Sequence, residues 1–222
     1  EMDEVALRSH NNVERTTKEG DFKEEIVPIE IPQKKGKPPL MFEKDEHYIP
    51  GLTMDRLAAL PPAFIPKVGK VTAGNSSGIN DGAAAMVIMS AAQAKEMGLK
   101  PIVRIKAVGY GAVHPAIMGL GPVPAVRDLL KRSGFKLSDF ELIELNEAFA
   151  AQSLAVCNTL GLDPAKVNPM GGAIALGHPL GATGAIRSAT AIHALHRNKL
   201  KYSMVSMCVG MGQGAAGIFE RC

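Results

Sequence analysis

The stretch FELIELN, Phe140–Asn146, runs directly into EAFAAQSLAVCNTLG, Glu147–Gly161, and this pair of segments decides the fold class. The first segment is a short apolar run of the kind that forms a buried strand. The second has the length of a helix and closes on a glycine. A strand that leads straight into a helix is the building unit of an α/β protein, so the neighbouring segments are expected to repeat it.

Upstream of this pair the same alternation continues. AAAMVIMS, residues 83–90, is predicted as a buried strand, and AAQAKEMGLK as a short helix that ends at Gly98. IVRIKAVGYGAV, Ile102–Val113, is a second predicted strand. PAVRDLLKRSG has Pro124 near its start and Gly134 just past its end, and these residues are typical of the beginning and the end of a helix.

Downstream, a glycine-rich turn precedes ATGAIRSATAIHALHR, a predicted helix, and two closing strands, YSMVSMC and AAGIFE. Strand and helix therefore alternate over most of the chain, which predicts a layered α/β architecture. Eight of the 15 prolines lie between Pro28 and Pro66, so that part is predicted as extended loops with short elements. Its lysines Lys34, Lys35 and Lys37 fit either an anionic ligand or a solvated loop, and the loop is favoured.

Composition excludes several classes of protein. The 222 residues are 46% hydrophobic and 21% charged, with a net charge of +3, which is too balanced for a nucleic-acid surface. No apolar run approaches the ~18 residues of a membrane helix. The three cysteines include no CxxC pair, which argues against a disulfide scaffold or a zinc ribbon. We therefore expect no partner nucleic acid, no membrane and no metal.

The chain opens at Glu1 inside the helical-looking segment EMDEVALRSHNNVERTTKEG, without an initiator Met. We interpret this as an interior start, so that any targeting signal is missing from these residues. A cytoplasmic protein is expected, with a mitochondrial or peroxisomal one as the alternative.

Glycine marks the candidate functional loops. Nine of the 23 glycines lie between Gly171 and Gly217, in NPMGGAIALGHPLGATGA and CVGMGQGAAG. Each loop holds one residue that can move protons, His178 in the first and Cys208 in the second. Glycine lets backbone approach a ligand closely, and α/β folds bind ligands at such loops. The other five histidines lack this setting and are interpreted as structural: His10, His47, His114, His193 and His196.

Each candidate also has a purely structural interpretation. Cys208 at a strand end fits a core position as well as a catalytic one. Asn146 fits the N-cap of the helix that follows, and Glu147 fits a solvated acid in its first turn. TAGNSSGINDG, residues 72–82, is similar to a phosphate-binding loop, but it lacks a P-loop lysine, so a nucleotide-binding domain is disfavoured.

Four motifs, in order along the chain, resemble the thiolase family of acetyl-CoA acetyltransferases and 3-ketoacyl-CoA thiolases. They are TAGNSSGINDGAA, NEAFA at Asn146–Ala150, GGAIALGHPLGATGA at Gly171–Ala185 and CVGMGQG at Cys208–Gly214. The resemblance runs from about Arg8 to the end of the chain, and its four motifs are highly specific together.

The resemblance implies an acyl transfer between a cysteine and coenzyme A, coupled to a Claisen condensation or its reverse. His178 would activate the nucleophilic cysteine and help to bind the thioester oxygen, while Asn146 would hold a water that completes this oxyanion hole. Cys208 would remove or return the α-carbon proton, and the Gly210 N–H would contribute to a second oxyanion hole. The family pattern places coenzyme A along Ser77, Met118, Ala148 and Phe149. No cofactor is implied beyond the coenzyme A thioester substrates.

The chain departs from the family pattern in two respects. Met211 stands where the family usually carries a glycine or another small residue, which implies a reshaped wall of the site. The cysteine that thiolases acylate lies in their N-terminal half, before the segment that matches residue 1. Neither Cys157 nor Cys222 has its motif, so the nucleophile is expected to be absent from these residues.

The resemblance also implies an architecture. Thiolases have two βαβαβαββ halves and a loop domain, which assigns residues 1–72 to the rear of the loop domain. Residues 73–100 become the last strand and helix of the N-terminal half, and residues 101–222 one complete C-terminal half in an α/β/α arrangement. We expect a missing half or complementary chain as partner, and a dimer or tetramer of copies. The alternative function is a non-catalytic fragment that binds coenzyme A or another subunit.

Overall fold

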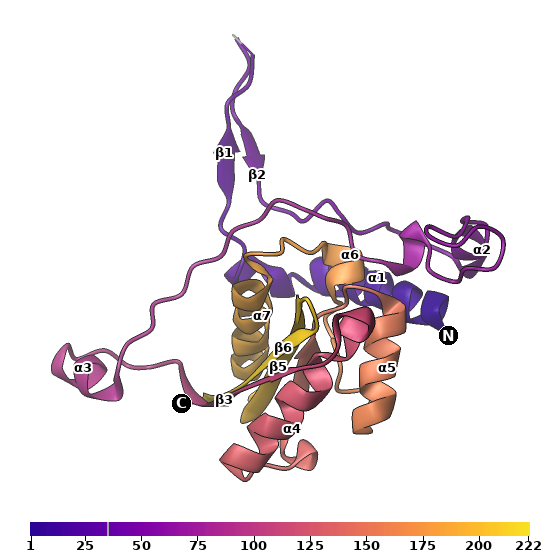
Figure 1. Ribbon diagram of the computed structural model, residues 1–222. Coiled ribbons are helices and arrows are strands. Elements are labelled where there is room, and N and C mark those ends of the chain that lie inside the picture. Colours follow the sequence, from indigo (N-terminus) through magenta and orange to yellow (C-terminus); the bar gives the residue numbers. More distant parts are fainter. Residues whose placement is uncertain (35) are drawn as a thin grey trace.

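A computed structural model describes residues 1–34 and 36–222, so the expectation on Lys35 lies outside the described residues. Its centre is a four-stranded mixed sheet in the order β3–β6–β5–β4 (Figure 1). The strands are β3 (Val103–Ala112), β4 (Leu142–Leu145), β5 (Tyr202–Gly210) and β6 (Gln213–Arg221). Strands β4 and β5 are parallel, with Leu145 opposite Ser206, and the other pairs are antiparallel.

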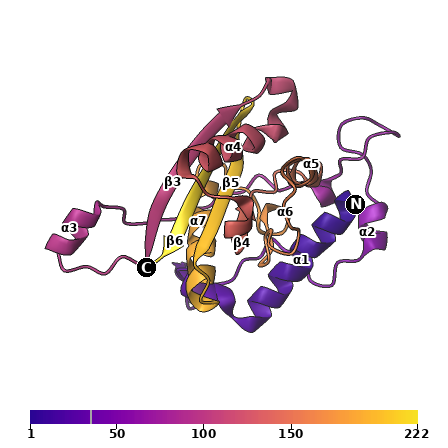
Figure 2. The ribbon, with the colours of Figure 1, turned by 90° about the horizontal axis from the view of Figure 1, so that it is seen from below.

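Helices cover both faces of this sheet. On one face, α4 (Pro122–Ser133) and α5 (Ala150–Leu160) close an apolar cluster that includes Leu129, Val156 and Met204. On the other, α7 (Thr183–Arg197) packs with Val13 of α1 (Met2–Glu19) in a second cluster, and Figure 2 shows α1 next to α6, beyond β4. The predicted layered α/β fold is therefore confirmed.

The helix ends follow the sequence signals, but one strand of the expected pattern is very short. Gly134 and Gly161 adopt left-handed conformations just past α4 and α5, as their positions predict.

The third strand of the βαβαβαββ pattern is reduced to one parallel bridge between Ile143 and Val167. Prolines at 164 and 169 flank this bridge, and proline cannot donate to a sheet.

The N-terminal third contributes few strands. After η1 (Asp21–Glu24), the hairpin of β1 (Ile29–Ile31) and β2 (Leu40–Phe42) projects away from the body (Figure 1). Lys34 and Lys37 are exposed in this hairpin, which agrees with the solvated-loop interpretation. The remaining short elements are α2 (Met54–Ala58), η2 (Ala73–Asn75), α3 (Ala91–Glu96), η3 (Pro115–Leu120), η4 (Leu137–Asp139) and α6 (Ala173–Leu176).

The predicted strand at residues 83–90 is wrong for this chain. These residues form no strand in the structure, and Val87 and Ile88 are exposed on a long segment that leads out to α3 (Figure 1). A strand needs neighbouring backbone to satisfy its N–H and C=O groups, and the described residues offer this segment no such neighbour. Among the described helices, none is long and apolar enough to cross a membrane.

Candidate active site

Asn146 stands at the carboxyl end of β4. Its backbone N–H donates to Ser206 O of β5 at 2.9 Å, which extends the parallel pairing one residue beyond the strand. Helix α5 begins only at Ala150, with Phe149 as its N-cap, so the N-cap interpretation of Asn146 is wrong. The Asn146 side chain is fully buried instead, and within the described residues its Oδ1 atom has no hydrogen-bond partner.

His178 is held from three sides. Its backbone N–H lies 3.2 Å from both Gly78 O and the Asn80 Oδ1 atom. Its ring Nε2 lies 3.3 Å from Asn146 Nδ2, and its Nδ1 lies 2.7 Å from Thr183 Oγ1. An amide nitrogen is only a donor, so Nε2 accepts and Nδ1 carries the proton. The Thr183 hydroxyl then accepts from Nδ1 and donates its own proton to Pro179 O at 2.8 Å.

The surroundings of His178 favour its neutral form. Burial lowers the pKa of the imidazole, and the positive charge of Arg187 lowers it further. A neutral imidazole with its lone pair at Nε2 can take a proton from a group placed beside Asn146.

Cys208 lies on the neighbouring strand. It is two residues beyond Ser206 on β5, opposite Gly214 of β6, and 8% exposed. Because β4 and β5 are parallel, Asn146 and Cys208 are at the same edge of the sheet. No hydrogen bond joins the thiol to His178 in the part of the chain that the structure describes. Burial raises the pKa of the Cys208 thiol.

The backbone beyond Cys208 is irregular. The pairing shifts between Cys208 and Gly210, so Val209 forms a bulge, a feature that often re-aims side chains next to active sites. Gly210 has a φ of 102°, and the tip residues Met211 and Gly212 have φ values of 51° and 89°. Two successive positive φ values are those of a type I′ hairpin turn. Met211 is therefore held in a left-handed conformation, and its side chain is 76% exposed at the tip of the β5–β6 hairpin.

Glu147 is not the solvated acid that its place after Asn146 allows. The side chain is buried, and its carboxylate accepts from the Ser9 hydroxyl at 2.7 Å and from Asn168 Nδ2 at 2.8 Å. The Ile174 N–H donates to the same carboxylate at 3.3 Å. These donors come from α1 and from the loop that leads to His178, so Glu147 anchors the site to both. No local sequence pattern signals a contact across such separations.

The residues expected along coenzyme A are close together in part. The Ser77 N–H donates to Ala148 O at 3.0 Å, and Ser76 pairs with Phe149. Phe149 also meets Phe64 edge-on, with ring centroids 6.4 Å apart. Met118 lies apart from these residues in sequence, on η3, which packs against α5.

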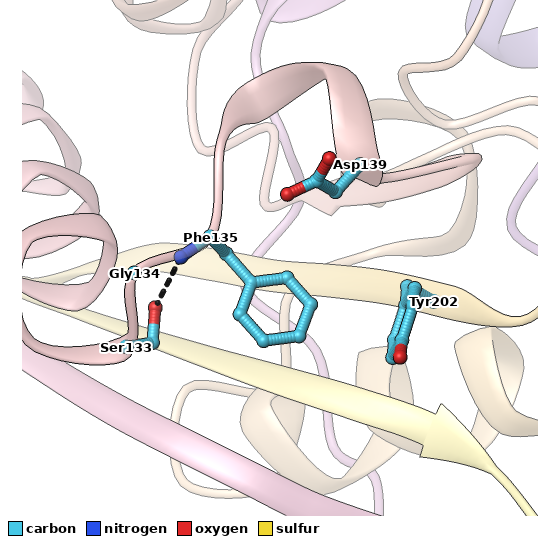
Figure 3. Close-up of a pocket in the computed structure, with 5 residues that line it drawn as sticks. All are labelled: Ser133, Gly134, Phe135, Asp139 and Tyr202. Carbon is cyan, nitrogen blue, oxygen red and sulfur yellow. Dashed lines mark hydrogen bonds between the residues drawn. The ribbon is translucent and has the colours of Figure 1, made fainter.

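One surface hollow lies away from these residues. It has a volume of about 390 Å³ and is lined by Ser133, Gly134, Phe135, Asp139 and Tyr202 (Figure 3). Tyr202 is the first residue of β5, so this hollow is at the opposite end of the strand from Cys208. Ligands of α/β folds bind at the carboxyl ends of strands, so we do not assign it to the site. Among the described residues, no three His, Cys, Asp or Glu side chains are placed to hold a metal ion.

Fold and site together define a layered α/β protein that presents an amide, an imidazole and a thiol at one edge of its sheet. The family model described as "Thiolase, C-terminal domain" matches residues 99–221, and "Thiolase, N-terminal domain" matches residues 1–92. The chain belongs to the thiolase family.

Known relatives agree over the whole chain. The beta-ketothiolase BktB of Cupriavidus necator is 50% identical over 221 residues, which are 100% of this chain and 56% of the relative. A crystal structure of the Bacillus anthracis acetyl-CoA acetyltransferase superposes with a TM-score of 0.95 at 47% identity, over 100% of this chain and 55% of the other. The human mitochondrial 3-ketoacyl-CoA thiolase in complex with CoA has a TM-score of 0.94 at 44% identity, over 100% and 54%. The chain thus spans about half the length of these relatives.

Proposed function

We propose that the protein carrying this chain is a thiolase-type acyltransferase. It would join two acyl-CoA molecules by Claisen condensation, or cleave a 3-ketoacyl-CoA with CoA, and this chain would supply Asn146, His178 and Cys208. The observation that carries the proposal is the 3.3 Å contact between Asn146 Nδ2 and His178 Nε2, at the sheet edge where Cys208 also lies. Family membership supports the same reaction class.

In this proposal His178 serves the acylation step. Its Nε2 lone pair takes the proton of the attacking thiol, the new sulfur–carbon bond forms at the thioester carbonyl, and the CoA sulfur leaves. The protonated Nε2 then donates a hydrogen bond to the thioester oxygen. Asn146, whose Oδ1 has no partner among the described residues, would hold a water in the same oxyanion hole.

Cys208 serves the carbon–carbon step. In condensation the Cys208 thiolate takes a proton from the α carbon, this carbon forms a bond with the acyl carbon of the acylated enzyme, and the acyl carbon–sulfur bond breaks to release the enzyme cysteine as a thiolate. In thiolysis the sulfur returns this proton to the leaving carbon. The raised pKa of Cys208 supports a thiol that holds its proton at neutral pH, which is the form that thiolysis requires. The Gly210 N–H would help to bind the oxyanion of this step.

The acylated cysteine would come from the part of the protein that this chain does not match. Cys157 lies on α5 against an apolar cluster, where burial raises its pKa, and Cys222 is exposed at the end of β6. Among the described residues, neither one forms a hydrogen bond with Asn146 or His178. The chain spans 56% of the Cupriavidus relative, which leaves room for a nucleophile-bearing half.

Coenzyme A would lie along Ser77, Met118, Ala148 and Phe149, and the Ser77–Ala148 hydrogen bond supports a common wall for the first and third of these. We propose no cofactor besides the thioester substrates. The division into residues 1–72, 73–100 and 101–222, a cytoplasmic location and a dimer or tetramer of copies stay predictions.

The test is thiolysis of acetoacetyl-CoA by CoA, measured by mass spectrometry of the acetyl-CoA formed. We expect His178→Ala and Cys208→Ala each to lower kcat by about a thousandfold. His196→Ala is the matched control, since this exposed histidine on α7 bonds only to Ile102 O among the described residues. Equal and minor losses from all three variants would contradict the proposal. Binding of CoA without turnover by the wild type would favour the non-catalytic alternative.

A further inference from the structure

Arg187 is a buried cation that the proposed chemistry leaves unexplained. It lies on α7, and its side chain is 3% exposed. Its Nη1 atom donates to the Glu144 Oε2 atom at 3.3 Å and to Gly171 O at 3.2 Å. A guanidinium stays protonated in proteins, so this is a permanent positive charge inside the fold.

Each of the two acceptors of Arg187 lies on a segment that carries one partner of the Asn146–His178 hydrogen bond. Glu144 lies on β4, two residues before Asn146, and Gly171 opens the loop that carries His178. One guanidinium therefore joins the strand end to the loop.

Gly171 leaves this loop little freedom to adjust. Its φ is 92°, and a Cβ atom there would lie 2.3 Å from Val13 Cγ2 and 2.7 Å from Ser9 O. The backbone is thus pressed against α1, and the carbonyl that Arg187 binds is fixed in place. Arg187 therefore binds one group in the loop of His178, the Gly171 carbonyl, and one group near the end of β4, the Glu144 carboxylate.

Three carboxyl groups face Arg187 from different segments of the chain. Glu144 faces it from β4, Glu25 from the segment after η1 and Asp45 from the segment after β2. Burial raises the pKa of Glu25 to about 7 and of Glu144 to about 8, and it raises that of Asp45 too. The other charged or titratable groups that act on these carboxyls are Asp21, Glu46, His47, Glu147 and Arg197.

We propose that Arg187 is a positioning residue, which joins the end of β4 to the loop of His178 and so holds Asn146 and His178 at hydrogen-bonding distance. The inference rests on the proposed acyl transfer, because it names what keeps a residue of that site competent. Burial lowers the pKa of His178 and the charge of Arg187 lowers it further, which agrees with a cation held near the imidazole.

The main variant is Arg187→Met, which retains length and apolar packing but removes the charge and the donors. We expect kcat of thiolysis to fall by about 10–100-fold while KM changes by less than about threefold. Without the cation the pKa of His178 rises, so the acid limb of the pH–rate profile moves to higher pH. A merely structural role would lower the yield of folded protein without moving this limb.

Two further variants separate charge from geometry. Arg187→Lys keeps the charge but loses the planar fork, so kcat falls while the acid limb stays in place. Arg132→Met is the matched control, since Arg132 lies near the end of α4, on the other face of the sheet, and pairs with Asp128 at 3.3 Å. It is expected to leave both kcat and the limb unchanged.

A readout independent of activity keeps this inference separate from the proposed function. NMR titration of the histidine rings, with the His178 signal assigned by its loss in His178→Gln, gives the pKa of His178 directly. A higher pKa in Arg187→Met than in the wild type is the expected result, and Arg187→Gln replaces this variant if it does not fold. An equal pKa, or a lysine variant with wild-type kcat, would overturn the inference, whereas a wild type without thiolysis would overturn only the proposed function.

Discussion

Residue by residue, the site depends on close contacts that glycine alone permits. Gly172 is the clearest case, because a Cβ atom there would lie 2.2 Å from the Glu147 carboxyl carbon. Glu147 is itself fixed by donors from Ser9, Asn168 and Ile174, so it cannot move aside without breaking buried hydrogen bonds.

Gly172→Ala is therefore expected to lower the free energy of unfolding by about 1–3 kcal/mol, the usual effect of overpacking a buried site. Urea denaturation measures this value. Gly181→Ala is the control on the same loop, since a Cβ atom at Gly181 meets nothing within 4 Å. A Gly172 variant as stable as the Gly181 variant would show that Glu147 is not the rigid anchor described above.

The raised pKa of Cys208 predicts a pH dependence. Condensation needs the thiolate to remove a proton, and a pKa raised by burial keeps the sulfur protonated at neutral pH. The rate of condensation should thus keep rising with pH beyond about 8.5, the ordinary value for a cysteine. Exchange of the acetyl-CoA methyl protons with deuterated solvent, followed by NMR, measures this step. A rate that levels off below that pH would contradict the role of Cys208.

Among the elements, the β5–β6 hairpin is the most constrained. Its type I′ turn places Met211 and Gly212 in left-handed conformations, and a Cβ atom at Gly212 would lie 2.1 Å from Val113 O. The two tip residues share a sign of φ but differ in their surroundings, because the Met211 side chain is exposed.

Met211→Asn is expected to stabilise the protein by about 0.5–1 kcal/mol, since asparagine tolerates this conformation better than methionine. Gly212→Ala is expected to destabilise it by more than about 2 kcal/mol, because strain and collision add. Thermal unfolding of both variants makes the comparison. The changes in the free energy of unfolding must have opposite signs in the two variants. A destabilising Met211→Asn would mean that the exposed Met211 side chain makes a contact of its own.

At the scale of the whole molecule, the chain exposes apolar surface that its pattern assigns to a core. Val87 and Ile88 are 87% and 70% exposed, and the segment that carries them has no strand partner among the described residues. Because exposed apolar surface drives association, the chain by itself is expected to self-associate.

Analytical ultracentrifugation of the 222-residue chain tests this expectation. The sedimentation coefficient should rise with concentration, and the double variant Val87→Lys and Ile88→Lys should weaken the rise. Ala83→Lys, a charge placed in the same segment without removing a large apolar side chain, is the control. A concentration-independent monomer would contradict the expectation.

The sequence predicts most of the fold because the alternation of strands and helices and the helix-ending glycines are local signals. Gly134 and Gly161 mark their helix ends correctly. The strand predicted at residues 83–90 does not form. An apolar run indicates that a segment is suited to burial, but it does not indicate which backbone pairs with it. His178 and Cys208 stand out through their glycine-rich loops. Arg187 and Glu147 do not, since their partners lie far away in sequence and no spacing rule joins them.

The most direct test of the central claim is a single turnover of the whole protein with acetyl-CoA, followed by intact mass and by acetoacetyl-CoA formation. The claim is that Asn146, His178 and Cys208 act on one thioester. It predicts that Cys208→Ala accumulates the acetylated enzyme but forms no acetoacetyl-CoA, while His178→Ala becomes acetylated far more slowly. Acetoacetyl-CoA formed at the wild-type rate by either variant would contradict it.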